Sequence, residues 1–386
     1  MAFAENTDQS KRTVPVPTKR VLSANSTSND DWSAQTCAGV GDVVSYRLEA
    51  TLPEDLDSYT TYSLWFNDAL GEGLAYANDS VHTYVAHKDS KQDDISLSVT
   101  IDGQTMRVGD NDIKSLSASL APSDVVVVEY DCVVRDTAAN GLTKGNDNTL
   151  TLQYTHSPTQ EDLVTQSIRP VAKVYSFQID LHKVAGDDGS DLAGACFVVQ
   201  NAQGMYRTAS GTWAKEQADA QVVATNSNGV TSFSGLGEGT YTITETTAPA
   251  GYALLEQPVA VTLATSNIDS NERTLTASAT GSDAKVVAVD AGTGIATVQV
   301  EDPKSPKSES PSTPSSETPH RASGSQSNPT SGNTSSTTTG GAATSRTSTP
   351  GTGDRTLVVS GVVLVVAVAL IVAGHMRKQR ARSDDA

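Results

Sequence analysis

Residues 177–183 read FQIDLHK, a stretch in which apolar and polar side chains alternate. A period of two places one face of a β-strand in a core and leaves the other face in water. The same alternation recurs in several further stretches, at residues 44–52, 62–66, 150–154, 195–199 and 259–263. Gly, Asn, Asp and Pro separate these runs, and no convincing amphipathic helix pattern is present. The sequence therefore predicts an all-β protein built from Ig-like β-sandwiches.

The strand-forming region is long enough for two such sandwiches in tandem. A polar segment at 157–166, SPTQEDLVTQ, interrupts the run of strands near its middle. We place the domain boundary after residue 172, which gives a first domain over residues 12–172 and a second over residues 173–302. Each domain then has enough residues to form a core of its own.

The charge and the cysteine count exclude several classes of protein. The 386 residues include 45 acidic and 27 basic side chains, for a formal charge of −18. A basic face for phosphate groups is lacking, so we expect no nucleic-acid partner. The three cysteines are too few for a disulfide scaffold. Cys37 and Cys132 could form one bridge, although unpaired thiols are the default expectation, and Cys196 takes the outward register. We expect neither a cofactor nor a metal site.

Three ionisable residues of the second domain keep the register of the core. Lys183 follows the apolar positions of the 177–183 stretch, Glu245 follows Tyr241 and Ile243, and Asp302 follows Val298 and Val300. Ionised groups are almost never buried singly. Three strands of this domain, namely the first, a middle one and the last, therefore each point one ionisable group inward. These three groups require a joint explanation.

The first domain repeats this arrangement. Asp68, on a middle strand, is in phase with the apolar positions of the 62–66 stretch. Asn148, on the expected last strand of this domain, is in phase with those of the 150–154 stretch. Lys19 shares its parity with Val21 near the first strand. Asn146 has the same parity as Asn148 and is a rival for the same role.

One chemistry accounts for both sets of residues. Burial lowers the pKa of an amine and raises that of a carboxyl group, so the neutral forms are favoured in a dry core. A neutral lysine amine is a nucleophile, and a protonated carboxyl group can polarise a neighbouring carbonyl. Held in contact, the groups can condense to an amide, with loss of ammonia from Asn or of water from Asp. The alternative is a buried salt bridge, or strand ends that are more exposed than their register indicates.

Two long segments resemble known pilin domains. GVGDVVSYRLEATLPEDLDSYTTYSLWFNDALGEGL and GNDNTLTLQYTHSP resemble the fimbrial isopeptide-formation domain of Gram-positive pilins. DLHKVAGDDGSDLAGACFVV, GLGEGTYTITETTAPAGY and TVQVEDPK resemble the SpaA-type, or collagen-adhesin B-type, domain.

The resemblance implies a role for each of the inward-facing residues. It implies that Lys19 bonds to Asn148 with the assistance of Asp68. It also implies that Lys183 bonds to Asp302, where Asn is common in the family, with the assistance of Glu245.

The C-terminal part has three successive segments. Residues 303–348 contain no large apolar side chain and are expected to form a disordered Ser/Thr/Pro stalk that crosses the cell wall. Residues 356–374 form an uncharged stretch long enough for a transmembrane helix, and four basic residues follow it. The whole segment 349–386, with Pro-Gly-Thr-Gly at its start, resembles the sorting signal of Gram-positive wall proteins. The resemblance implies that a sortase cleaves between Thr352 and Gly353; the alternative is a permanent membrane anchor.

The N-terminus has no recognisable signal peptide, although Ala2-Phe3-Ala4 resembles the end of one. We interpret residues 1–11 as the remnant of a leader whose true start codon lies upstream.

The sequence as a whole indicates a secreted structural subunit of a pilus at the cell surface, with no enzymatic turnover. The expected partners are a sortase and, through Thr352, peptidoglycan or another pilin subunit, with membrane attachment only before sorting. The Tyr-Pro-Lys-Asn type motif of backbone pilins is absent, which favours a minor or terminal pilin, a truncated backbone subunit or a monomeric wall protein. The alternatives are a wall-anchored adhesin for host matrix or glycan and, less favoured, a surface enzyme.

Overall fold

The computed structural model describes residues 14–305, apart from residues 24, 25, 27, 29, 30, 167 and 282. Within this part of the chain no helix is both long and apolar enough to cross a bilayer. The expected leader, most of the stalk, the cleavage site at Thr352 and Gly353 and the expected membrane helix all lie outside the described residues. They remain predictions from the sequence.

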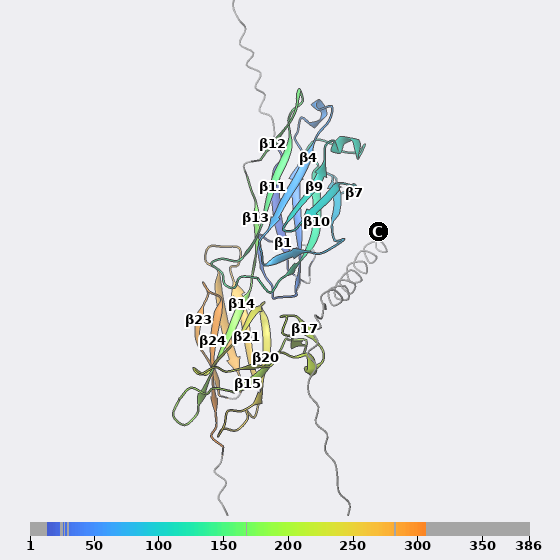
Figure 1. The fold of residues 1–386 in the computed structure, drawn as a ribbon. Helices are drawn as coiled ribbons and strands as arrows, with labels where there is room; N and C mark the ends of the chain where they lie inside the picture. Colours follow the sequence, from blue (N-terminus) through green and yellow to red (C-terminus); the bar gives the residue numbers. More distant parts are fainter. Residues whose placement is uncertain are drawn as a thin grey trace, which may run out of the picture. The chain divides into compact units, whose positions relative to one another are not determined.

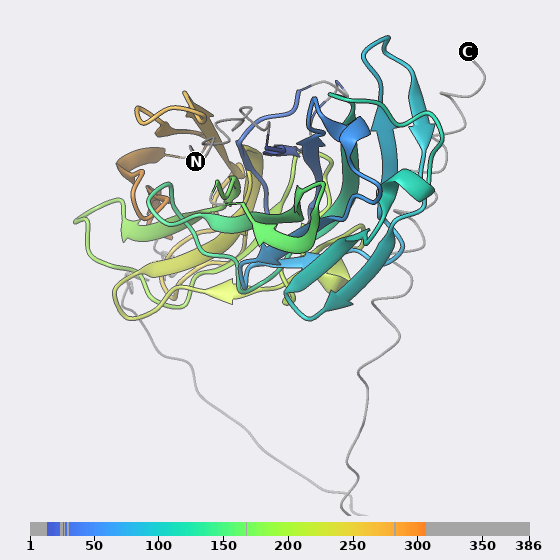
Figure 2. The same ribbon diagram turned by 90° about the horizontal axis from the view of Figure 1, so that it is seen from above.

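The first sandwich, drawn from blue to green in Figure 1, consists of a six-stranded and a seven-stranded sheet. The first sheet has the order β1 (Val16–Leu22), β3 (Val43–Thr51), β10 (Val125–Val134), β6 (His82–Ala86) and β7 (Gln92–Asp94), and β5 (Leu74–Tyr76) pairs with β10. The second has the order β2 (Gln35–Cys37), β13 (Val171–Tyr175), β11 (Asn146–Ser157), β4 (Leu64–Leu70), β9 (Thr105–Asp110) and β8 (Ser98–Asp102), and β12 (Gln160–Thr165) pairs with β11. Figure 2 shows the same strands from above.

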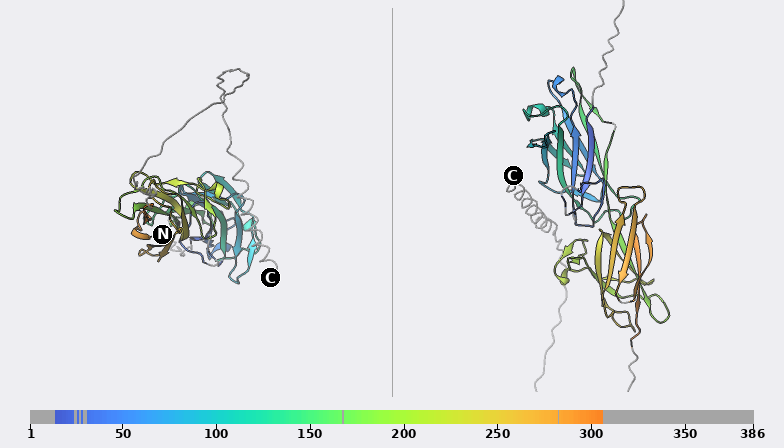
Figure 3. Two further views of the ribbon diagram at one scale, coloured as in Figure 1. Left: turned by 90° about the horizontal axis from the view of Figure 1, so that it is seen from below. Right: turned by 180° about the vertical axis from the view of Figure 1, so that it is seen from behind.

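The second sandwich consists of a four-stranded and a seven-stranded sheet. The first has the order β19 (Val230–Leu236), β14 (Phe177–Ala185), β24 (Ile295–Asp302) and β23 (Ala284–Asp290). The other has the order β17 (Trp213–Ala214), β16 (Tyr206–Arg207), β15 (Cys196–Gln200), β20 (Gly239–Thr247), β21 (Val259–Ser266) and β22 (Thr274–Thr280), and β18 (Val223–Ala224) pairs with β15. β23 and β24 run side by side in the rear view of Figure 3.

Regular helix is limited to single 3₁₀ turns in the described residues. These are η1 (Leu56–Ser58), η2 (Ile113–Ser115) and η3 (Gln217–Asp219). The prediction of an all-β sandwich fold is therefore confirmed.

Each sandwich has its own apolar core, as the alternating pattern predicts. Along β3 every second side chain, from Val44 to Ala50, is fully buried in the first core. Along β14 the same holds for Phe177, Ile179 and Leu181 in the second core. The hydrophobic effect thus fixes which face of each strand turns inward, and with it the direction of any polar residue in the same register.

The change from one core to the other falls a few residues after the expected boundary at 172. Ala172 and Val174 of β13 belong to the first core, whereas Tyr175 and Phe177 belong to the second. The polar segment at 157–166 is not a linker, because it contains the turn and the strand β12, which pairs with β11 in a hairpin. The chain therefore passes between the sandwiches at Tyr175 and Ser176, without a separate linker.

The cysteines are unpaired, which was the default expectation. Cys132 is buried in the first core and Cys37 in the second, so the bridge considered between them does not form. Cys196 is partly exposed, as its outward register predicts. Disulfides therefore do not reinforce either sandwich.

This placement predicts three free thiols per chain. An alkylating reagent added to denatured, unreduced protein should add three groups, counted by intact mass, because no pair of cysteines is within bonding reach. A reduced sample serves as the control. Uptake of one group, rising to three after reduction, would contradict the separation of Cys37 and Cys132 into different cores.

Candidate functional site

The three residues singled out in the second domain lie together in its core. Lys183 is on β14 and Asp302 is at the end of β24, which is the parallel neighbour of β14. Glu245 is on β20, in the opposite sheet. Lys183 and Asp302 have no solvent exposure and Glu245 is 8% exposed. The inward orientation expected from their register is confirmed.

The contacts of Lys183 connect both acids. Its Nζ donates a hydrogen bond to Asp302 Oδ1 and lies 3.5 Å from Glu245 Oε1. Glu245 is held in place by the backbone N–H of Leu255, which donates to Oε2 at 2.9 Å. Asp302 Oδ2 has no hydrogen-bond partner among the described residues, and Glu245 Oε1 has the ion-pair contact with Lys183 but no hydrogen bond there. The lysine is thus in direct contact with a carboxyl group that is only half satisfied.

The surroundings of this site favour neutral acids. Burial raises the pKa of Glu245, and burial also raises the pKa of Asp302 against the opposing effect of Lys183. The ring centroid of Phe197 lies 5.9 Å from Lys183 Nζ, so the amine is close to an aromatic ring. Burial therefore shifts both acids toward the protonated form beside the lysine.

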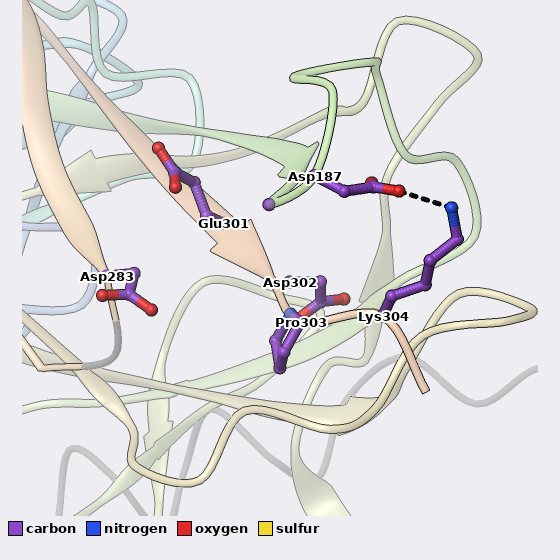
Figure 4. A pocket seen from close by; sticks show the side chains of 7 residues that line it. Asp187, Asp283, Glu301, Asp302, Pro303 and Lys304 are labelled. Atoms are coloured by element: carbon purple, nitrogen blue, oxygen red, sulfur yellow. Dashed lines mark hydrogen bonds and ion pairs between the residues drawn. The ribbon is translucent and has the colours of Figure 1, made fainter. Parts of the chain in front are cut away.

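A polar pocket of about 320 Å³ adjoins Asp302 (Figure 4). Its other lining residues include Asp283, Glu301, Pro303 and Lys304, and Lys304 pairs with Asp187. The site is therefore close to solvent, although the side chain of Asp302 itself is buried.

The candidate residues of the first domain also meet, but across its two sheets. Lys19 is on β1 of one sheet, whereas Asp68 and Asn148 are on the adjacent strands β4 and β11 of the other. Lys19 is 4% exposed, Asp68 1% and Asn148 0%. Lys19 Nζ forms an ion pair with Asp68 Oδ1. Burial lowers the pKa of the Lys19 amine, against the opposing effect of Asp68.

A buried tyrosine that the sequence analysis missed completes this site. The Tyr130 hydroxyl donates to Asp68 Oδ2 and accepts a hydrogen bond from Asn148 Nδ2 at 2.7 Å. It also lies 3.3 Å from Lys19 Nζ. The Tyr76 hydroxyl donates to Asp68 Oδ2 as well, at 3.1 Å. Two signals in the sequence pointed to Tyr130. It shares its strand parity with Val126 and Val128, and a buried tyrosine hydroxyl requires a polar partner.

Of the two rival asparagines, only Asn148 lies at the lysine site. The side chain of Asn146 instead satisfies backbone groups: it accepts from Ala139 N–H and donates to the carbonyls of Ala139 and Val174. The Oδ1 atom of Asn148, by contrast, has no hydrogen-bond partner among the described residues.

The expectation that Asn148 lies on the last strand of its domain is wrong. β12 and β13 follow β11 and both pair with it in the same sheet. Asp302, in contrast, ends the last strand of the second sandwich.

Comparison with known proteins agrees with this architecture. The model of the SpaA prealbumin-like fold domain matches residues 177–277. The trypsin-resistant surface T6 protein of Streptococcus pyogenes is 26% identical over 282 residues, which cover 66% of this chain and 47% of the T6 protein. The chain thus spans about half the length of this curated relative.

Two solved structures show the same fold at low identity. The group B streptococcus pilus 2b backbone protein has a TM-score of 0.52 and 20% identity, covering 70% of this chain and 96% of that one. BcpA, the major pilin subunit of Bacillus cereus, has a TM-score of 0.51 and 17% identity, covering 76% of this chain and 71% of that one. The relatives named here are surface and pilus proteins, not enzymes.

Because the side chain of Asn146 bonds to backbone groups and not to the lysine site, its removal should lower stability without affecting amide formation. Asn146→Ala should lower the free energy of unfolding by about 1–3 kcal/mol, because it leaves buried backbone groups without partners. Urea unfolding measures this loss. Asp147→Ala, which removes an exposed partner of Lys173, is the control and should cost less than about 1 kcal/mol. Equal, small effects of the two changes would contradict the role assigned to Asn146.

Proposed function

We propose that this chain is a structural subunit of a Gram-positive surface pilus, and that each sandwich is closed by an internal amide bond. The observation that carries the proposal is the pair of buried sites, in each of which a lysine meets an acid and an acceptor. Lys183 contacts its acceptor Asp302 directly, whereas Lys19 is connected to its acceptor Asn148 through the Tyr130 hydroxyl.

The proposed reaction in the second sandwich is a condensation. Lys183 Nζ bonds to Cγ of Asp302 through its lone pair while the bond from Cγ to one carboxyl oxygen breaks. That oxygen takes one proton from the amine in addition to its own and leaves as water. Protonated Glu245 stabilises the charge that develops on the remaining oxygen. Each chain reacts once, and a polar pocket adjoins the residue from which the water is released.

An unsatisfied oxygen in the second sandwich favours this reaction over an ordinary buried ion pair. A buried ion pair offsets its desolvation only when its remaining lone pairs are also satisfied. Asp302 Oδ2 lacks a hydrogen-bond partner among the described residues, which is costly in a permanent structural pair. In the first sandwich both oxygens of Asp68 have partners, so the proposal there rests on the contacts of Lys19 and Asn148 with the same hydroxyl.

The bonds would reinforce a protein that has no disulfide in its described part. Lys183 and Asp302 are 119 positions apart. By the loop-entropy argument used for disulfides, a link over a loop of this size stabilises by about 4–5 kcal/mol. An amide also resists reduction, which suits a fibre exposed outside the cell.

The sequence supplies the proposed surface attachment. Sortase cleavage after Thr352 would transfer its carboxyl group to peptidoglycan or to another pilin subunit, and the relatives named above are surface and pilus proteins. The absence of a Tyr-Pro-Lys-Asn type motif favours a terminal or minor pilin, a truncated backbone subunit or a monomeric wall protein. The similarity to a pilus backbone protein and a major pilin subunit supports the backbone subunit among these, and a monomeric adhesin for a host ligand is the alternative.

The amide bonds predict a defined mass deficit. Residues 12–305, purified and denatured, should be lighter than the sequence mass by one ammonia and one water. Lys19→Ala should restore only the ammonia and Lys183→Ala only the water, because each lysine serves one site. Intact mass spectrometry measures both. A wild-type mass equal to that of the sequence would refute the bonds, and a Lys183→Ala protein that still loses water would refute the proposed pairing.

The assembly predicts a ladder in wall extracts. An antiserum to residues 12–305 should stain a series of bands that survive boiling in detergent, and deletion of residues 349–386 should abolish them. A single band of monomer size in the wall fraction would contradict the pilus proposal and support the monomeric adhesin.

A further inference from the structure

The Tyr130 hydroxyl is positioned between the acid and the leaving group of the first site. It is 2% exposed, and its ring stacks on Tyr46 with centroids 5.5 Å apart. The hydroxyl bonds to Asp68 Oδ2 on one side and to Asn148 Nδ2 on the other. Asn148 and Asp68 are diagonal neighbours across β4 and β11, because Leu150 lies opposite Asp68 and Asn148 lies opposite Leu70. The hydrogen bonds therefore connect Asp68 to Asn148 through Tyr130.

The two oxygens of Asp68 face different reaction partners. Oδ1 contacts Lys19 Nζ, from which a proton must leave, whereas Oδ2 contacts Tyr130. The Asn148 nitrogen that would leave as ammonia is bonded to Tyr130, 2.7 Å away. Burial raises the pKa of Tyr130 above its usual range, so the side chain remains a neutral hydroxyl that can both give and accept a proton.

We propose that Tyr130 is a catalytic residue that relays a proton from Asp68 to the leaving nitrogen of Asn148. The inference rests on the amide bond proposed for the first site. Transfer of one proton within the Lys19–Asp68 ion pair leaves Lys19 as a neutral amine. With that proton on Oδ2, Asp68 donates to Tyr130 and the Tyr130 hydroxyl turns to Asn148 Nδ2, which reverses the two hydrogen bonds of the structure. Lys19 Nζ then bonds to Asn148 Cγ and gives one proton to Asp68 Oδ1, while Tyr130 gives its hydroxyl proton to Nδ2 and receives the proton that Asp68 carried on Oδ2. The bond from Cγ to Nδ2 breaks and ammonia leaves, with Asp68 and Tyr130 restored to their protonated states.

The second sandwich provides an internal comparison. There Phe197, which has no hydroxyl, is the aromatic ring near the lysine, and Glu245 is within ion-pair distance of Lys183 itself. The group that would leave is an oxygen of Asp302, on the same carboxyl group that Lys183 contacts. A separate relay is not required in that arrangement.

The test is Tyr130→Phe in the full chain. Protein made by cell-free synthesis is denatured in acid at timed intervals, and intact mass follows the loss of ammonia and of water separately. Loss of ammonia should slow by about 10²- to 10⁴-fold, the usual contribution of a positioned acid–base group. Loss of water at the second site should keep its rate and shows that the sample has folded there.

Tyr76→Phe is the matched control. It also removes a hydroxyl bonded to Asp68 Oδ2, but within the described part of the chain that hydroxyl bonds to Asp68 alone. It should leave the rate of ammonia loss nearly unchanged. Equal slowing in both variants would overturn the relay and indicate a role in orienting Asp68.

Two further outcomes separate the relay from the proposed function. If wild-type protein loses no ammonia, the amide bond itself is refuted. If wild-type and Tyr130→Phe proteins lose ammonia at the same rate, only the relay is refuted.

Should Tyr130→Phe fail to fold, 3-fluorotyrosine at position 130 keeps the ring and hydroxyl but changes the acidity of that hydroxyl. A changed rate of ammonia loss supports the relay, and an unchanged rate overturns it.

Discussion

A lysine ammonium that is removed from water must be paired or must lose its charge, and each sandwich buries one such lysine. The effective penalty for burying an ion is several kcal/mol, more than a single solvent-exposed ion pair contributes. Lys19 and Lys183 are enclosed by two sheets of apolar side chains, so their polar contacts are limited to the few groups that the opposing strands present. This constraint explains why an acid and an acceptor occupy neighbouring inward positions in both domains. It also creates the conditions for a reaction, because burial favours the neutral amine and the protonated acid.

The two sites differ in how they would carry tension. In the second sandwich the proposed bond joins β14, where the chain enters, to the end of β24, where it leaves. Pulling force would pass through the bond and by-pass nearly the whole domain. In the first sandwich the bond would join β1 to β11, and β12 and β13 would remain outside the closed loop. Their pairing with β11 and β2 is non-covalent, so this segment is the part of the first domain that force can extend.

The alternating pattern was sufficient to predict the sandwich fold and the inward direction of Lys183, Asp302 and Asp68. A strand has only two faces, so one buried neighbour at a spacing of two fixes the direction of the next side chain. The same argument could not choose between Asn146 and Asn148, which share a face. That choice depends on which asparagine lies diagonally from Asp68 on β4, and the pairing of strands far apart in the sequence determines this. Tyr130 was missed because its strand, VVVVEYDCVV, has valines on both faces, so the parity that it shares with Val126 and Val128 does not by itself show which face is inward.

Single-molecule extension of the protein from residue 14 to residue 305 tests the central claim most directly, because it measures how much chain the sandwiches can release. With both amides formed, unfolding should lengthen the molecule only by the segments outside the two closed loops, chiefly residues 149–182. Release of the chain between Lys183 and Asp302, or between Lys19 and Asn148, would contradict the account and leave two sandwiches held together only by non-covalent forces.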